Sequence, residues 1–517
     1  MSRLHNEADV PIEYDDDVID KPDSKGNTVV SPALVKQALL HIMATECHLN
    51  NAIYGSHAMI RSDLEWFAPS MPHSSVLTVF EFMGITKTWL GFFDAFLTPP
   101  LRFSDEAETR IRRRGTPISY SLHVLFGEAL LFIMDFAVNQ RTKGLHLYRL
   151  HDDLWLWDHD VVKVAGAWAE MNHYATLAGL KFNAKKTGSA YVGPPANTSG
   201  LPNGDIRWGF LTFNLSESRF VVDQNDVDKH IVKMRHQLAS TKSVFGWINA
   251  YNKYMTFVLR NFGGIPGNCF SKEHIVDMID TLGRIQRELF PESATGGAVS
   301  FLKRTIEERF GIRGLPEGYF YFPISSGGLE LRNTMLELLA LQRRLEPLIT
   351  VGDKAGDIDI SDHYFHQDMA IAHEKFPKYM EEDKKNYATL KAGWDNAAEY
   401  RRATTRYTTN VVPEAFMSFQ DYVTLREIWL STWGALYLNM LETPPQHNAV
   451  LTPKMREMMS NNLGGKLWDN MDWYEKWIIS MYGEEVVKKF GGLEAVDPNL
   501  IPVAMVELFK TSRMKLK

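Results

Sequence analysis

Apolar residues recur at the three- and four-residue spacing of an amphipathic helix over most of this chain. Ser31 precedes the first such segment as a candidate N-cap. One face of a later segment carries Val227, Ile231, Met234 and Leu238. The pattern predicts mostly helical structure beyond residue 245, and before it helices over residues 32–60, 74–97, 117–138, 161–180 and 224–240.

The hydrophobic pattern takes the period of a β-strand in two places. Leu and Trp alternate over residues 154–157, apolar residues also dominate 145–150, and the polar triplet His151-Asp152-Asp153 lies between these two runs. This predicts a strand, a tight turn with two carboxylates at its tip, and a second strand. Residues 205–222 indicate two further short strands around a polar turn. The fold class expected is therefore α+β.

Composition indicates a globular protein with more than one domain, since the chain has 517 residues, 45% hydrophobic and 23% charged. Its only cysteines, Cys47 and Cys269, exclude a disulfide framework and a cysteine-rich zinc module. No apolar run reaches the roughly 18 residues of a membrane span, and residues 1–20 lack an apolar signal segment. We therefore expect an intracellular protein, nuclear or cytoplasmic, that is neither secreted nor bound to a membrane.

The formal net charge of −7 counts against a nucleic-acid-binding protein, because such proteins are more often basic. Local patches decide binding, however, and basic residues cluster at 110–114 and 181–186. Residues 1–30 are acidic and rich in turn formers, which is typical of a flexible arm. The segments 292–299 and 351–361 have the composition of linkers.

The adjacent Asp152 and Asp153 repel each other, and water, a partner or a cation must relieve that repulsion. A solvated Asp-Asp turn is the commonest case. Here the apolar flanks predict a buried hairpin stem, which favours a cation. Mg²⁺ commonly takes one or two carboxylates plus phosphate oxygens of a substrate. Two such ions about 4 Å apart activate a hydroxyl nucleophile and stabilise a leaving pyrophosphate. A zinc or iron site that uses His151 and His159 with the aspartates is the alternative.

A two-metal site needs one more carboxylate, and Asp63 is the candidate. It follows a short apolar stretch and precedes Leu64, Trp66 and Phe67. Taken alone, Asp63 fits a helix cap or a surface position equally well.

Five segments in this order resemble the palm of reverse transcriptases. The resemblance is closest to the branch that holds telomerase, group II intron enzymes and non-LTR retroelements, and to reverse-transcriptase-like open reading frames of fungi. Each segment is weak alone, and the ordered series is specific. YFYFPISSGGLELRN at 319–333 is also similar to a segment that follows the thumb in those fungal frames. The five segments are SDLEWF (62–67), RRGTPISYSLHVLFGEALL (113–131), LYRLHDDLWLW (147–157), AGLKFNAKKTGSAYVG (178–193) and RWGFLTF (207–213).

The resemblance implies a right-hand polymerase fold. Residues 61–222 would form the palm, an antiparallel sheet with helices, and residues 223–290 would form thumb-like helices. Residues 31–60 would be a short helical remnant of the fingers, because the family's fingers normally need far more chain before Asp63. Residues 300–517 would form a mostly helical C-terminal region of unassigned role.

The resemblance also implies the roles of individual residues. Asp63, Asp152 and Asp153 would bind two Mg²⁺ or Mn²⁺ ions, helped by the backbone carbonyl of Leu64, and Lys186 would assist the leaving pyrophosphate. Arg112 to Arg114 would neutralise phosphates, whereas Trp155 and Trp157 are expected in the core. The nucleotide- and template-binding residues would be Phe67, Ala68, Arg114, Gly115 and Pro117, and the primer grip would comprise Trp208, Gly209 and Phe210.

Two departures from the family pattern change the expected chemistry. Ile118 and Ser119 replace the Gln and Gly that usually follow the proline, and an Ile side chain makes no hydrogen bonds. Ala68 stands where the family has an aromatic ring that blocks the ribose 2′-hydroxyl. Unless Phe67 or Trp66 takes that place, ribonucleotides should be accepted.

The sequence thus predicts template-directed nucleotidyl transfer, foremost an RNA-directed DNA polymerase with a two-metal mechanism. Its partners would be an RNA template, a nucleic-acid primer and nucleoside triphosphates. Three alternatives stay open: a catalytically lapsed relative that binds nucleic acid or acts as a scaffold, an RNA-directed RNA polymerase, and an unrelated α+β protein with chance motifs.

Overall fold

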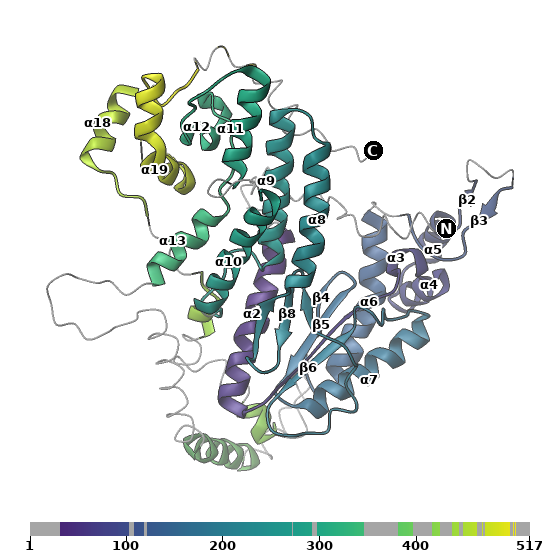
Figure 1. Cartoon of the computed structure of the whole chain (residues 1–517). Coiled ribbons are helices and arrows are strands. Elements are labelled where there is room, and N and C mark those ends of the chain that lie inside the picture. Colours follow the sequence, from purple (N-terminus) through teal and green to yellow (C-terminus); the bar gives the residue numbers. More distant parts are fainter. Residues whose placement is uncertain are drawn as a thin grey trace. The chain divides into compact units, whose positions relative to one another are not determined.

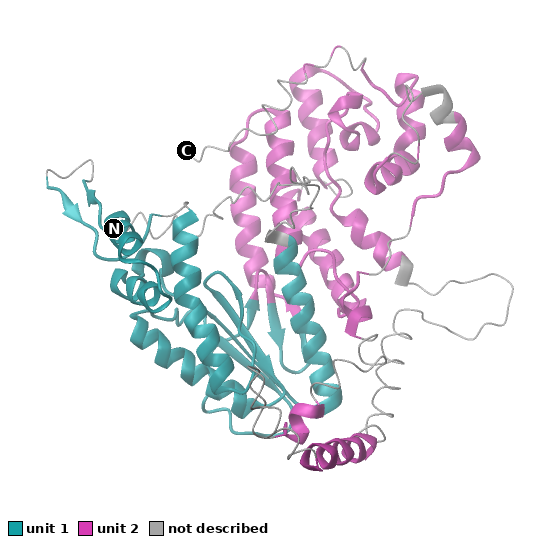
Figure 2. Cartoon of the chain, turned by 180° about the vertical axis from the view of Figure 1, so that it is seen from behind, with its two compact units in different colours: residues 1–207, 212–220 teal, residues 208–211, 221–517 magenta. Residues whose placement is uncertain are grey.

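A computed structural model of the chain contains two compact units (Figures 1 and 2). Unit 1 comprises residues 1–207 and 212–220, and unit 2 comprises residues 208–211 and 221–517. The structure describes residues 32–102, 108–117, 121–270, 272–291, 297–345, 381–396, 416–423, 437–443, 448–462, 468, 471–496, 500 and 502. Residues 1–30, Ile118, Ser119 and the segment 351–361, which carry sequence predictions, lie outside these ranges.

Unit 1 is built on a four-stranded sheet with the order β4-β5-β1-β6, in which all neighbouring strands are antiparallel. In the central pair, Asp63 of β1 lies opposite Asp153 of β5. The short hairpin β2 (Pro100–Leu101) and β3 (Arg110–Ile111) stands apart from this sheet. The four strands are β1 (His57–Asp63), β4 (Tyr148–Leu150), β5 (Asp153–Asp158) and β6 (Gly188–Val192).

One face of the sheet packs against helices (Figure 1). Helix α7 (Val161–Ala178) contacts β1 and β5, and α6 (Ser121–Arg141) packs against α7. Around them lie α3 (Phe67–Ser70), α4 (His73–Phe82) and α5 (Lys87–Leu97). Their apolar side chains form one core with the sheet, which includes Ile60, Leu154, Leu156, Phe126, Leu130, Met134, Val164 and Met171.

The opposite face of the sheet carries Trp155 and Trp157, which are 1% and 4% exposed. Helix α2 (Pro32–Tyr54) contacts β1, and its Glu46 accepts a hydrogen bond from Nε1 of Trp157 at 2.6 Å. Both tryptophans therefore belong to the core, as the sequence predicted. The two central strands are covered on both faces.

Unit 2 is mostly helical in the part that the structure describes. Helix α8 packs against α9 and α10, α10 contacts α11 and α13, and α12 packs against α19. A three-stranded sheet, β7 (Arg207–Trp208), β8 (Leu211–Asn214) and β9 (Arg219–Val222), lies where the chain passes between the units. The helices are α8 (Gln224–Ser240), α9 (Val244–Asn261), α10 (Lys272–Leu289), α11 (Gly297–Phe310), α12 (Gly318–Tyr321), η1 (Ile324–Ser326), α13 (Met335–Leu345), α18 (Pro453–Asn462) and α19 (Trp473–Phe490).

Most of the predicted elements are confirmed, including the hairpin at 148–158. Residues 205–222 form three short strands, one more than predicted. The buried face of α8 is Val227, Ile231, Met234 and Leu238 together with His230. The helix predicted over 32–60 is wrong at its end, because α2 stops at Tyr54 and β1 starts at His57. The helix predicted over 74–97 is two helices, since Gly84 with φ 85° ends the first.

The sequence has no uninterrupted apolar run of about 18 residues, because His123, Glu128 and Asp135 interrupt the apolar residues of α6. Within the described residues, α6 is long and apolar enough to cross a membrane. The core helix of a globular unit passes the same test, and Phe126, Leu130 and Met134 of α6 lie fully buried in unit 1.

Candidate active site

Three carboxylates meet at one end of the four-stranded sheet in unit 1. Asp63 is the last residue of β1, and Asp153 is the first residue of β5. Because these two residues are directly opposite in the ladder, their side chains leave the same face of the sheet. Asp152 precedes Asp153 in the turn, so the sheet places all three predicted aspartates together.

The turn itself is as short as the sequence predicted. Leu150 pairs with Asp153, so His151 and Asp152 are its only unpaired residues. His151 has a φ of 60°, in the left-handed region. Two-residue hairpin turns favour positive φ, because their twist then matches that of the strands.

Burial and neighbouring negative charge raise the pKa of the two aspartates at the turn. Burial raises the pKa of Asp152, and the negative charge of Asp63 raises it further. Burial also raises the pKa of Asp153, which the guanidinium of Arg61 partly offsets. A divalent cation between the ionised carboxylates would relieve their repulsion.

Two basic side chains pair with the carboxylates. Nζ of Lys186 lies 3.1 Å from Oδ2 of Asp63. Arg61 donates from Nε to Oδ1 of Asp153 at 3.2 Å, and its Nη2 lies 3.1 Å from the same oxygen. The guanidinium of Arg61 also lies 5.5 Å from the centre of the Trp155 ring, which holds it in one orientation.

The N-x-x-K-T segment explains why Lys186 reaches Asp63. The backbone N–H of Asn183 donates to the carbonyl of Asp63 at 2.8 Å, and Oδ1 of Asn183 accepts from the N–H of Lys185 at 3.1 Å. The hydroxyl of Thr187 lies 2.7 Å from that of Ser62, where both side chains are buried. The Asn and Thr thus fasten the loop to the end of β1, and the Lys between them faces the carboxylate.

The R-G-T-P turn docks on the segment that follows Asp63. The N–H of Gly115 donates to the carbonyl of Met71 at 2.8 Å, and that of Thr116 donates to Ala68 at 3.1 Å. Gly115 has a φ of 79°, and a Cβ added there would lie 2.5 Å from the carbonyl oxygen of Pro69. Arg114 is exposed beside this turn, and Pro117 is partly buried.

Arg112 contacts the backbone of α5, and the phosphate-neutralising role that the sequence suggested for it stays a prediction. Its guanidinium donates to the carbonyl of Leu97 at 2.9 Å and to that of Phe96 at 3.2 Å. Arg112 therefore satisfies backbone carbonyls at the end of α5, and the exposed Arg113 and Arg114 are the residues of this run that remain directed to solvent.

The two aromatic neighbours of Ala68 differ in exposure: the ring of Phe67 is packed in the core, and that of Trp66 is exposed. Phe67 is 2% exposed, and a Cβ added at Gly127 would lie 3.0 Å from its ring. Trp66 is 60% exposed and has a φ of 52°. Ala68 itself is partly buried. In this structure the ring of Phe67 is committed to the core.

The primer-grip residues Trp208, Gly209 and Phe210 belong to unit 2. The N–H of Phe210 donates to the carbonyl of Asn261 at 2.9 Å, and a Cβ added at Gly209 would lie 2.7 Å from that same oxygen. These residues therefore pack at the end of α9, and their predicted role stays a prediction.

The zinc or iron alternative is wrong, because β5 separates the two histidines. His159 stacks on Tyr54 at 3.8 Å and pairs with Asp158 at 2.9 Å, at the other end of β5 from His151. Among the described residues, no group of three or more His, Cys, Asp and Glu side chains is close enough to hold a metal ion as it stands. Carboxylates are nonetheless ligands that Mg²⁺ prefers, and in this structure Lys186 and Arg61 pair with Asp63 and Asp153.

The sequence did not identify Arg61, Glu128 and Arg149, which contact the carboxylates or their turn. Arg61 and Arg149 could have been noticed in the sequence as charged residues inside apolar strand segments. Arg61 follows the apolar residues of β1, and Arg149 lies between Tyr148 and Leu150.

No protein-family model and no curated protein match this chain. It is similar to solved structures of telomerase from Candida. For apo telomerase from Candida tropicalis truncated from its C-terminal domain, the TM-score is 0.28 and the identity 14%, over 38% of this chain and 40% of that one. For telomerase from Candida albicans with a TWJ fragment of telomeric RNA, the values are 0.29 and 12%, over 55% and 52%.

The corresponding RNA complex of telomerase from Candida tropicalis gives a TM-score of 0.30 and 12% identity, over 63% of this chain and 51% of that one. The chain spans about half the length of the structures it matches. Similarity this weak assigns no activity, so the chemistry follows from the side chains of this protein alone.

Proposed function

We propose that this protein is a template-directed nucleotidyltransferase, foremost an RNA-directed DNA polymerase of the reverse transcriptase type. The observation that carries the proposal is the register of Asp63 opposite Asp153 at the Asp152 turn, with Lys186 on Asp63. Phosphoryl transfer with two metal ions requires carboxylates that bind the ions and a basic side chain near the phosphates. The aspartates and Lys186 are groups of these kinds.

Each side chain of the site has a task in that reaction. Asp63 and Asp152 hold divalent cations, helped by the backbone carbonyl of Leu64. The bound ions, Mg²⁺ or Mn²⁺, supply the charge that activates a primer hydroxyl and stabilises the leaving pyrophosphate. Lys186 moves from Asp63 to the triphosphate, a shift that suits a flexible side chain that is 53% exposed.

The partners follow from this chemistry: an RNA template, a nucleic-acid primer and nucleoside triphosphates. The exposed Arg113 and Arg114 lie on the turn that docks behind Asp63, where they can neutralise phosphates of the template or the nucleotide. Trp208, Gly209 and Phe210 are proposed to contact the primer.

A second candidate is a lapsed relative that binds nucleic acid without catalysis. The observation that favours it is that Lys186 and Arg61 already neutralise two of the three carboxylates. An RNA-directed RNA polymerase is the third, since no aromatic ring stands at Ala68 to exclude a 2′-hydroxyl.

Primer extension tests the proposal directly. Purified protein is given an RNA template with an annealed DNA primer, Mg²⁺ or Mn²⁺, and dNTPs or rNTPs in parallel. We expect extension that is lost by at least 10³-fold in Asp152→Asn and Asp63→Asn. Asp205→Asn, at a side chain that is 70% exposed, is the matched control and should retain full activity.

If the folded wild-type protein extends no primer under any of these conditions, the polymerase proposal fails and the lapsed relative becomes the favoured candidate. The ratio of dNTP to rNTP incorporation decides between the two polymerases. Comparable efficiencies are expected from Ala68, and a strong preference for dNTPs would show that another group excludes the 2′-hydroxyl.

A further inference from the structure

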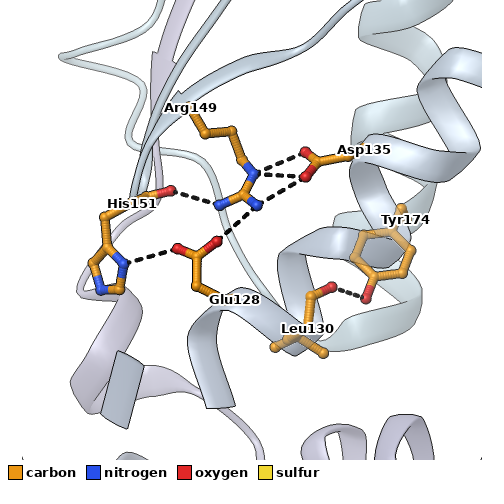
Figure 3. A network of polar contacts seen from close by, with 6 residues as sticks. All are labelled: Glu128, Leu130, Asp135, Arg149, His151 and Tyr174. Atoms are coloured by element: carbon orange, nitrogen blue, oxygen red, sulfur yellow. Dashed lines mark hydrogen bonds and ion pairs between the residues drawn. The ribbon is translucent and has the colours of Figure 1, made fainter. Parts of the chain in front are cut away.

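An ion-pair network on α6 and β4 reaches the catalytic turn (Figure 3). Arg149 of β4 lies between two carboxylates of α6. Its Nη2 is 2.9 Å from Oε2 of Glu128, and its Nε donates to both oxygens of Asp135 at 2.8 and 2.9 Å. The Arg149 side chain is only 12% exposed, whereas Glu128 and Asp135 are 43% and 28% exposed, so the guanidinium is buried beneath two partly solvated carboxylates.

The network contacts His151 at two atoms. Oε1 of Glu128 lies 3.3 Å from Nδ1 of the imidazole, and Nη1 of Arg149 donates to the backbone carbonyl of His151 at 3.4 Å. Figure 3 shows the ring of His151 directed at Glu128 and its carbonyl directed at Arg149. Both the side chain and the backbone of the residue before Asp152 are thus held from one side.

His151 needs that support because its backbone is in a region that side chains rarely occupy. Its φ is 60°, which is unfavourable for a residue with a Cβ. The ring packs edge-on against Phe67 at 5.9 Å and lies 5.1 Å from the ring of His123. A Cβ added at Gly127 would lie 3.3 Å from Cε1 of His151, so the imidazole packs where Gly127 of α6 has no side chain.

We propose that Glu128 and Arg149 are positioning residues that fix His151 and, through it, aim the carboxylate of Asp152 at the divalent cation. The inference rests on the proposed function, because Asp152 must be a cation ligand for its aim to matter. A partner of this kind acts on metal affinity without touching the metal.

The roles of the two carboxylates on α6 separate this proposal from plain stabilisation. Asp135 holds Arg149 and makes no contact with His151 among the described contacts, whereas Glu128 contacts both. Loss of either carboxylate weakens the ion pairing of Arg149. Only the loss of Glu128 also releases the imidazole.

The experiment measures Mn²⁺ affinity by electron paramagnetic resonance on the full chain, with the thermal unfolding midpoint of each variant. We expect Glu128→Ala to weaken Mn²⁺ binding about tenfold and Glu128→Gln, which retains hydrogen-bonding atoms, to restore most of that affinity. Asp135→Asn should leave Mn²⁺ affinity within about twofold of wild type, whatever its effect on the unfolding midpoint. Glu170→Gln on α7, whose partner Arg141 is 4.0 Å away, is the control outside the network.

Wild-type Mn²⁺ affinity in a folded Glu128→Ala protein would overturn the inference, as would equal losses in Glu128→Ala and Asp135→Asn. Should Glu128→Ala not fold, Arg149→Lys carries the test. A lysine lacks the planar group that reaches Glu128, Asp135 and the His151 carbonyl together, so Mn²⁺ binding should weaken severalfold, and unchanged affinity would overturn the inference. If the wild type binds Mn²⁺ no better than Asp63→Asn and Asp152→Asn, the proposed function fails and this inference fails with it. That outcome differs from Mn²⁺ binding that requires the aspartates but has the same affinity in Glu128→Ala, which overturns this inference alone.

Discussion

At the scale of single residues, ionisation of Asp152 and Asp153 lowers the free energy of unfolding. Burial raises the pKa of Asp152 and of Asp153, so the folded protein binds protons at these sites more tightly than the unfolded chain does. The stability that each contributes is complete below the unfolded pKa of about 3.9 and is lost as the pH rises through the raised folded pKa.

Replacing one of these carboxylates with its neutral isostere should therefore stabilise the protein at neutral pH. We expect Asp152→Asn to raise the free energy of unfolding by about 1 kcal/mol at pH 7 and to make no difference at pH 3. Urea unfolding at the two pH values checks this. Millimolar Mg²⁺ should stabilise the wild type alone, and a less stable Asp152→Asn at pH 7 would contradict the account.

Arg61 is expected to act on folding and on cation binding in opposite directions. Its side chain is 17% exposed, and Arg61→Met removes both the ion pair with Asp153 and the contact with Trp155. We expect the free energy of unfolding to fall by roughly 2 kcal/mol. Asp153 is then uncompensated, so Mn²⁺ should bind severalfold more tightly.

Thermal unfolding and electron paramagnetic resonance of Mn²⁺ measure these two effects separately. Arg207→Met is the control, because the ion pair of Arg207 with Asp205 does not include any of the three aspartates. Weaker Mn²⁺ binding in Arg61→Met would mean that Arg61 orients Asp153 for the metal and does not compete with it.

Sequence and structure agree best on the residues that local motifs define. Asp152 and Asp153 stand between two apolar runs, and Asn183 and Thr187 bracket Lys186 at fixed spacing, so each was predictable from its own neighbourhood. Arg61, Glu128 and Arg149 were not, because their partners are distant in sequence. The ion pair of Arg61 with Asp153, for example, depends on the register of β1 and β5.

At the scale of elements, strand β1 shows where periodicity fails. The sequence assigned residues 57–60 to a helix, and in the structure these four residues are buried in succession. A strand covered on both faces has no polar alternation, and its short apolar run is indistinguishable from a helical one. Strand β5 is equally buried over Leu154–Trp157, but the Asp-Asp turn before it disclosed the hairpin.

The R-G-T-P turn is expected to depend on glycine for two reasons, its positive φ and its closeness to Pro69. Gly115→Ala should destabilise unit 1 by roughly 3 kcal/mol, because strain and a 2.5 Å approach to the Pro69 carbonyl act together. Gly84→Ala is the matched control, since Gly84 has a φ of 85° and nothing within 4 Å of an added Cβ. It should cost only about 1 kcal/mol.

Differential scanning calorimetry of the two variants measures this difference. Equal losses would mean that the segment 68–72 moves aside for the new Cβ. In that case the turn would not be rigidly fastened behind Asp63.

Asp158, the last residue of β5, has a lowered pKa, whereas the two aspartates of the turn have raised ones. Burial raises its pKa, but hydrogen bonds from His159, from the N–H of Asp160 and from Lys163 outweigh that and lower it to about 2. Its stability contribution is present above the unfolded pKa of about 3.9 and is lost as the pH falls toward 2.

We therefore expect Asp158→Asn to lower the free energy of unfolding by about 2 kcal/mol at pH 7 and by much less near pH 2. Urea unfolding across this range checks the prediction. A loss that did not change with pH would point to packing of the side chain, and not its charge, as the cause.

At the scale of the whole molecule, the proposed chemistry divides unequally between the two units. The three carboxylates, Lys186 and the network of Glu128 and Arg149 all belong to unit 1, whereas the predicted primer grip belongs to unit 2. The boundary between the units falls within the strands at 207–222, and the division into a palm (61–222) and a thumb (223–290) stays a prediction. Helical periodicity in the remainder of unit 2 predicted its class of structure but assigned no task, because amphipathic helices pack alike in proteins of every function.

This division predicts where a divalent cation stabilises the chain. A ligand that binds only the folded state protects the cooperative unit to which it binds. Hydrogen exchange with and without Mg²⁺ should therefore slow for the backbone amides of β1, β5 and the turn between β4 and β5, and stay unchanged in α8 and α10 of unit 2. In Asp63→Asn the protection in unit 1 should disappear. Equal protection of both units in the wild type would show that they unfold as one, and protection confined to unit 2 would place the cation away from the aspartates.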